Sequence, residues 1–213
     1  MNAADMMKRI PLRRLIVMLI GVFVMGLGIT LFRLSMTGND PSTALAFAMG
    51  GKTGIPLSWS IITMNTLYFI GEIIYARKLI GIGTFINWFG VGLSADLWSL
   101  LLEKPLTQSD AFGYRLMIMA IGVLVLSFSA SMYQTADLGI APYDAISLTM
   151  EKHLPLPYFW CRIINDSVCA VATVLLGGIV GLGTLVCALG LGPFIAFFTR
   201  HAAMPMCGMK PQD

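Results

Sequence analysis

The apolar stretch GIGTFINWFGVGLSAD (Gly81–Asp96) recurs in altered form as GLGTLVCALGLGPFIA (Gly181–Ala196). Four glycines and a threonine coincide at an offset of 100 residues. Upstream, at an offset of 101, the segment RLIVMLIGVFV from Arg14 aligns without a gap with RLMIMAIGVLV from Arg115. The same offset pairs Gly38 with Gly139, Pro41 with Pro142, Pro56 with Pro157 and Trp59 with Trp160. Uncommon residue types that match at a constant offset indicate a duplication inside one chain.

The composition limits the class of protein. Of 213 residues, 57% are hydrophobic and 12% are charged, whereas a soluble domain is usually about 25% charged. We therefore expect an integral membrane protein whose surroundings are the lipid bilayer. The formal charge of +3 gives no indication of a nucleic-acid partner. The four cysteines form no CxxC motif, so neither a metal site nor a disulfide framework is predicted.

Six apolar segments approach the roughly 20 residues that a helix needs to cross the hydrocarbon core. They are Leu15–Phe32, Leu57–Tyr75, Thr84–Leu102, Leu116–Tyr133, Tyr158–Leu176 and Leu182–Phe198. The predicted fold is an all-α polytopic membrane protein made of two three-helix repeats, residues 1–105 and 106–213. Because three is odd, the second repeat crosses the bilayer in the opposite sense. The copies should then be related by a pseudo-two-fold axis in the membrane plane, as in many secondary transporters.

Basic residues predict the orientation of these helices. Clusters precede the first span and follow the second, fourth and sixth, at Lys8–Arg9, Arg77–Lys78, Lys152–His153 and Arg200. With six alternating helices all of these fall on one side, and the positive-inside rule makes that side the cytoplasm. Both termini are therefore expected to be cytoplasmic.

Each copy also has a shorter segment between its first two spans, GNDPSTALAFAMGGKTGIP and GIAPYDAISLTMEKHLPLP. Pro41 and Pro142 suit the first turn of a helix, where a missing N–H costs nothing. Ser42–Met49 and Tyr143–Met150 are too short to cross the bilayer. Either they lie at the interface or they re-enter the membrane with their helix N-termini facing a ligand.

Two of these motifs resemble a known family. LGIAPYDAIS (Leu138–Ser147) is similar to the LG-x-x-P-[WY]-D segment of YczE/YitT-like bacterial membrane proteins, and Gly81–Asp96 resembles their GxGT…G…D segment. The resemblance covers nearly the whole chain and implies a multi-pass protein of the bacterial inner membrane. It implies no established reaction, although such proteins are often described as hypothetical transporters. The copies differ at Ser42 and Thr43, which stand where the second half has Tyr143 and Asp144.

Polar residues inside the predicted spans are the candidates for function, since a charge near the bilayer centre costs about 2.5–3.5 kcal/mol or more. Arg162 and Asp166 are four residues apart, so they share a helix face. Asn165 lies beside them, and Asn65 is the equivalent of Asp166 in the first copy. We expect these four residues to bind a substrate at the repeat interface. The alternative is an ion pair that only stabilises the bundle.

Asp96 and Asp144 are further candidates, for ion or proton coupling. Asp96 lies about two-thirds of the way along its span, where burial would favour the neutral carboxyl. Asp144 lies at the start of a short helix, and the alternative role for it is to stabilise that helix's positive end.

No nucleophile elbow, HExxH motif or Walker sequence is present, so an enzyme is not expected and no cofactor is predicted. The sequence predicts a small-solute secondary transporter, the solute being a small molecule or an ion. The alternative is a non-transporting membrane scaffold or regulatory accessory protein. Glycine-rich helix faces also allow a homodimer.

Overall fold

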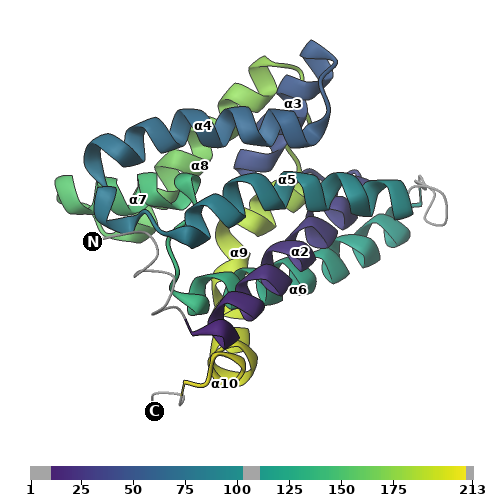
Figure 1. Cartoon of the computed structure of the whole chain (residues 1–213). Helices are drawn as coiled ribbons and strands as arrows, with labels where there is room; N and C mark the ends of the chain where they lie inside the picture. Colours follow the sequence, from purple (N-terminus) through teal and green to yellow (C-terminus); the bar gives the residue numbers. More distant parts are fainter. Residues whose placement is uncertain (1–10, 103–110, 210–213) are drawn as a thin grey trace.

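The computed structural model describes residues 11–102 and 111–209, and these residues form helices and no strand (Figure 1). The first half contains α2 (Leu12–Ser35), α3 (Pro41–Thr53), α4 (Leu57–Tyr75), the 3₁₀ turn η1 (Arg77–Leu79) and α5 (Ile82–Leu102). The second contains α6 (Phe112–Ala136), α7 (Pro142–His153), α8 (Tyr158–Leu175), α9 (Leu182–Phe198), the π-helical turn η2 (Thr199–Ala203) and α10 (Met204–Cys207). The boundary predicted after residue 105, and Lys8 and Arg9, lie outside the described residues.

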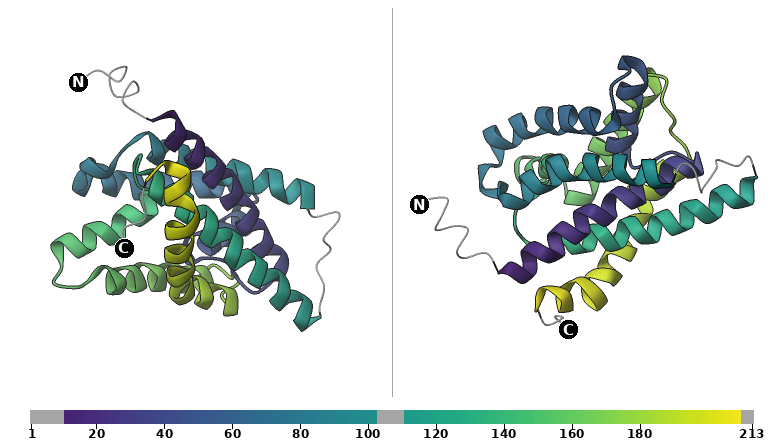
Figure 2. Two further views of the ribbon diagram at one scale, coloured as in Figure 1. Left: turned by 90° about the horizontal axis from the view of Figure 1, so that it is seen from below. Right: turned by 45° about the vertical axis from the view of Figure 1, so that its right-hand side comes forward.

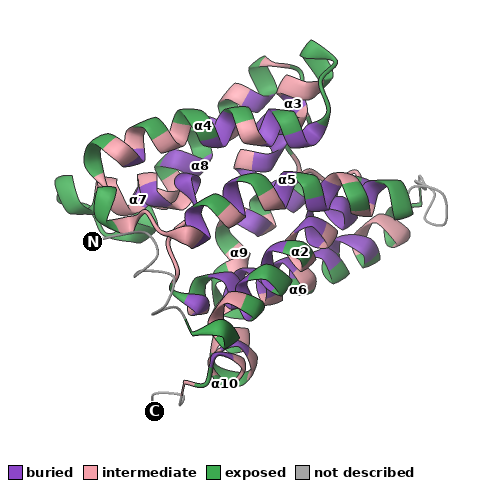
Figure 3. Cartoon of the chain, viewed as in Figure 1, coloured by how far each residue is buried: buried purple, intermediate pink, exposed green. Residues whose placement is uncertain are grey.

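Within residues 11–102 and 111–209, six helices are long and apolar enough to span a membrane, as predicted. The last span runs further than expected, from Leu182 to Cys207, because η2 and α10 continue α9 without a break. Many large apolar residues are exposed; Leu100 is 74% and Leu175 is 77% exposed. Figure 3 shows exposed residues along the outer faces of the helices. Such an apolar exterior is expected where lipid is the solvent. The number of these helices and their apolar outer faces indicate a multi-pass membrane protein.

The two halves pack together through equivalent helices. The first helices of the halves, α2 and α6, lie side by side in every view and form the centre of the bundle (Figures 1 and 2). Helix α2 packs on α5, and α6 packs on α9. Helix α3 contacts α8 of the other half, while α7 contacts α4. The two halves are therefore interlocked, and the core includes Met18 and Phe32 from one half and Tyr133 from the other.

The GxGT motifs contact the opposite half of the chain. The backbone N–H of Gly83 donates to the carbonyl oxygen of Leu138 at 2.8 Å, and that of Gly183 donates to Thr37 at 2.8 Å. Thr37 and Leu138 occupy equivalent positions in the loops that follow α2 and α6. Each loop thus satisfies an N–H in the first turn of the other half's last span, which would otherwise have no partner.

Glycine is required at one position in each of these loops, where the loop lies against the other half. Gly38 has φ +94° and Gly139 has φ +121°, conformations that residues with a side chain rarely adopt. A Cβ atom on Gly139 would lie 2.6 Å from the nitrogen of Gly81, and one on Gly38 would lie 2.4 Å from Oγ1 of Thr184. The repeated glycines therefore allow backbone of one half to approach backbone of the other.

The two short helices enter the bundle with their N-terminal halves. In α3, Thr43, Ala44 and Ala46 are buried while Lys52 is exposed. In α7, the corresponding gradient runs from buried residues near Pro142 to an exposed C-terminal end at 151–153. Helices lying on a surface would be exposed along one whole face. The N-terminal halves of α3 and α7 are therefore covered by the other helices.

Candidate functional site

A cavity of about 490 Å³ lies between the two halves, and the N-terminal ends of α3 and α7 both reach it. This volume lies in the usual range for a small-molecule site. Its polar lining residues include Asp40, Ser42, Thr43, Asn65 and Asn87 from the first half and Tyr133, Gln134, Tyr143, Asp144, Tyr158 and Arg162 from the second. Apolar side chains of α2, α4, α6 and α9 complete the wall.

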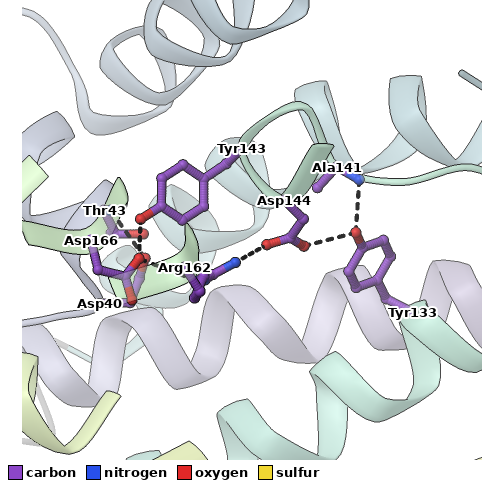
Figure 4. A network of polar contacts seen from close by, with 8 residues as sticks. All are labelled: Asp40, Thr43, Tyr133, Ala141, Tyr143, Asp144, Arg162 and Asp166. Carbon is purple, nitrogen blue, oxygen red and sulfur yellow. Dashed lines mark hydrogen bonds and ion pairs between the residues drawn. The ribbon is translucent and has the colours of Figure 1, made fainter. Parts of the chain in front are cut away.

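Arg162 of α8 is the centre of a polar network beside this cavity (Figure 4). Its Nη1 donates to Oδ1 of Asp144, and its Nε lies 3.2 Å from Oδ1 of Asp166. The guanidinium carbon also lies 4.7 Å from the centre of the Tyr143 ring, in a cation–π arrangement. The predicted contact between Arg162 and Asp166 is thus present, and Asp144 is a second acidic partner.

Two tyrosines fix the carboxylates of the network. The hydroxyl of Tyr143 donates to Oδ1 of Asp166, and that of Tyr133 donates to Oδ2 of Asp144 at 3.0 Å. The Tyr133 hydroxyl also accepts from the backbone N–H of Ala141 at 2.7 Å. Helix α7 has no side-chain cap of its own at Ala141, so Tyr133 of α6 supplies that function. Burial raises the pKa of Tyr143, which keeps its phenol protonated and able to donate.

Asp40 brings a third carboxylate to the cavity, from the first half of the chain. It is the N-cap of α3, where Oδ1 accepts from the backbone N–H of Thr43 at 3.2 Å. Figure 4 shows Asp40 next to Asp166, at the end of the network away from Tyr133. Burial raises the pKa of Asp40 above its ordinary value, and the capping contact with Thr43 and the charge of Arg162 offset only part of this effect.

Two buried amides complete the lining. Asn65 of α4 is 8% exposed and Asn87 of α5 is 5% exposed. Neither side chain forms a hydrogen bond with any of the described residues, although both line the cavity. Their amide groups are thus open to the cavity and available to a solute.

Of the six predicted site residues, the structure brings together Asn65, Asp144, Arg162 and Asp166 around this cavity. Asp166 contacts Arg162, which lines the cavity, but Asp166 does not line the cavity itself. Asp144 does not cap α7 with its side chain, which instead contacts Arg162 and Tyr133.

The other two predicted residues lie elsewhere. Asn165 is buried on α8 outside the cavity lining, and its Nδ2 has no partner among the described residues. The Oδ2 of Asp96 accepts from the backbone N–H of Ser58 at 3.3 Å, at the N-terminus of α4. Asp96 is likewise absent from the lining, and its geometry is that of a helix cap supplied by a neighbouring helix.

Sequence reasoning missed Asp40, Tyr133 and Tyr143 as members of the site. One signal exists for Tyr143, since the first copy has Ser42 at the equivalent position and the residue types differ sharply. Asp40 precedes Pro41 as an ordinary helix cap would, so nothing in its local sequence separates a cap from a cavity residue. Tyr133 lies in the last turn of α6 and joins the network because the short loop to Pro142 folds the start of α7 back onto its hydroxyl.

Comparison with known proteins gives relatives but no activity. The model of the "Family of unknown function (DUF6198)" matches residues 12–200. An uncharacterised protein of Haemophilus influenzae is 28% identical over 189 residues, covering 88% of this chain and 84% of the relative. The uncharacterised protein YyaS of Bacillus subtilis is 25% identical, covering 85% and 92%. The uncharacterised membrane protein YczE of Bacillus subtilis is 24% identical, covering 81% of each chain, which confirms the resemblance to YczE. No solved structure matches the chain.

Proposed function

Because the chain belongs to DUF6198, a family of unknown function, we propose from its own geometry that it is a small-solute secondary transporter. The solute would bind in the cavity between the two halves. The observation that carries this proposal is the cavity itself, lined by charged and polar side chains from both halves. A charged or polar side chain inside the membrane has an unfavourable free energy of insertion, so those that are present usually have a function.

An inverted repeat supports the same function. We propose that residues 1–105 and 106–213 cross the bilayer in opposite senses, since each contains three spans. The reciprocal hydrogen bonds of Gly83 with Leu138 and of Gly183 with Thr37 are those expected from a pseudo-two-fold axis. The cavity lies between the repeats, as in transporters whose halves rock around a fixed site.

We further propose that the protein resides in the bacterial inner membrane with both termini in the cytoplasm. The exposed side chains of Lys78 in η1 and Lys152 in α7 would then face the cytoplasm, and Lys52 in α3 would face the other side. Single cysteines introduced at these three lysines and labelled with an impermeant maleimide in intact cells test the arrangement. Labelling of Lys52→Cys and Lys152→Cys from the same side would contradict the inverted repeat.

Alternating access can be tested without knowing the solute. In a background with all four native cysteines replaced by alanine, Ser42→Cys places a near-isosteric thiol on the cavity wall. A transporter exposes this thiol to each side in turn, so an impermeant thiol reagent should label it from both sides. Ser60→Cys is the matched control, because Ser60 is fully buried and outside the lining. It should stay unlabelled.

The competing role is a scaffold that does not transport. In that case the contacts of Asp166 with Arg162 and Tyr143 would serve only to hold α7 against α8. A scaffold predicts labelling of Ser42→Cys from one side or from neither, and that result would overturn the transporter proposal. The cavity and its unpartnered amides favour transport, since a purely structural bundle gains stability by filling such space.

A further inference from the structure

We propose that the solute of this cavity is a small organic cation, an ammonium compound held by the carboxylates of Asp40 and Asp144. This inference rests on the proposed function and names its substrate class. Three features of the site support it, namely its net charge, its lining and its unsatisfied amides.

The charges around the cavity do not balance. Three carboxylates, Asp40, Asp144 and Asp166, surround one guanidinium, that of Arg162. The N-termini of α3 and α7 add roughly half a positive charge each. When all three carboxylates are ionised, about one negative charge remains, and a cationic solute would compensate it where protonation otherwise does. Asp40 forms no ion pair with any residue of the described ranges, so this carboxylate is the natural position for the missing positive charge.

Arg162 already has acidic partners. Its Nη1 and Nε are held by two carboxylates, and one face of its guanidinium lies against the Tyr143 ring. An anionic solute could approach only the remaining N–H groups of Arg162 and would meet Asp40, Asp144 and Asp166 as like charges. The site therefore discriminates against anions by repulsion.

The lining suits an organic cation better than a metal ion. No group of three metal-ligating side chains close enough to hold an ion exists among residues 11–102 and 111–209. The volume of about 490 Å³ is also far larger than a bare ion needs. The rings of Tyr133, Tyr158 and Phe159 line the space, and aromatic faces attract ammonium groups.

The unpartnered amides provide independent support for a ligand. Asn65 and Asn87 are more than nine-tenths buried, line the cavity and form no side-chain hydrogen bond with the described residues. Their oxygens can accept from the N–H or O–H groups of a solute that fills the cavity. Both belong to the first half, whereas Asp144 belongs to the second, so a solute held by all three would contact both halves.

The test uses two probes that differ only in charge, choline and its uncharged isostere 3,3-dimethylbutan-1-ol. Binding to the purified full-length protein in nanodiscs is measured by calorimetry, alongside tetramethylammonium, tetraethylammonium and acetate. We expect at least one ammonium ion to bind and, for choline, at least tenfold weaker binding of the isostere. Absence of binding by all three ammonium ions, equal binding of the isostere, or preferential binding of acetate would each overturn the inference.

Asp40→Asn is the decisive variant. Asparagine caps helices about as well as aspartate, so folding should be kept while the charge is lost. Ammonium affinity should fall at least tenfold. Asp137→Asn is the matched control, because Asp137 is exposed, lies in a left-handed conformation that asparagine tolerates, and is absent from the cavity lining. Asn65→Ala should weaken choline several-fold and gives a second measurement if Asp40→Asn folds poorly. Unchanged affinity in both site variants would contradict the proposal.

Flux measurements separate the two proposals. If proteoliposomes accumulate a neutral or anionic solute in a manner that Asp144→Asn abolishes, the transporter proposal stands and the cation inference fails. If ammonium ions bind as expected but are not carried across the vesicle membrane, the site assignment stands and the transport proposal fails.

Discussion

The backbone N–H of Gly183 lies 2.8 Å from the carbonyl oxygen of Thr37, which belongs to the opposite half of the chain. The equivalent contact joins Gly83 to Leu138 at the same distance. The repeated GxGT motif is therefore the place where each half binds the loop of the other. The GxGT motif therefore stabilises the contact between the two halves as well as the start of its own helix.

Substituting the loop glycines should destabilise this junction. Gly38→Ala and Gly139→Ala each combine a left-handed backbone with a Cβ closer than 3.0 Å to the other half. We expect each to lower the free energy of unfolding by about 1–3 kcal/mol, measured by thermal or denaturant unfolding in detergent. Gly71→Ala is the control, because nothing lies within 4 Å of its Cβ position. If the control is equally destabilised, the loss is not caused by the crossing of the halves.

Removal of the guanidinium should leave the carboxylates of the network without their cation. Arg162→Gln should destabilise the protein by about 3 kcal/mol, the low end for a broken buried pair because the Arg162 side chain is 28% exposed. Adding Asp144→Asn removes one uncompensated charge and should restore part of the loss. Thermal unfolding of both single variants and the double variant measures this coupling. Additive losses would show that the two side chains do not stabilise each other.

Asp96 should act as a cap rather than as a coupling group. Its carboxylate accepts from the backbone N–H of Ser58, a function that asparagine can also perform. Asp96→Asn should therefore retain stability and transport, while Asp96→Ala should lose about 1 kcal/mol of stability. Unfolding midpoints and uptake by proteoliposomes compare the two. Loss of gradient-driven uptake in a stable Asp96→Asn protein would instead identify Asp96 as the coupling residue.

Ammonium binding should depend on pH through Asp40. Because burial raises the pKa of Asp40, this carboxyl takes up a proton at a higher pH than an exposed aspartate. A bound proton cancels the charge that attracts the cation. The affinity for choline, whose own charge is constant, should thus fall by up to about tenfold per unit as the pH drops below that pKa.

Other groups facing Asp40 must be considered in that measurement. They are Tyr68 of α4, Asp144 of α7, Arg162, Asp166 and Cys169 of α8, and Cys187 of α9. Asp40→Asn isolates the contribution of Asp40, because it leaves all of these groups in place. The steep part of the pH dependence should disappear in this variant, and its persistence would assign the proton to another carboxyl.

The helices can be predicted from the sequence because hydropathy and helix length are local properties. The sequence predicts Leu57–Tyr75 with the bounds that α4 has. Helix spacing also identifies Arg162 and Asp166 as neighbours, and their atoms lie 3.2 Å apart. The pairing of Arg162 with Asp144 is not predictable in this way, since it depends on how α7 packs against α8. The same holds for Asp40, which a tertiary contact brings to the cavity from 122 positions earlier in the chain than Arg162.

The charged side chains of the cavity come unequally from the two copies. Arg162, Asp144 and Asp166 have Ile61, Thr43 and Asn65 as their counterparts in the first copy. If the two halves exchange conformations during alternating access, the charges of the cavity are arranged differently before and after the exchange. The outward-open and inward-open forms would then differ in free energy and would be unequally populated in the empty protein, because most of these charges lie in the second half.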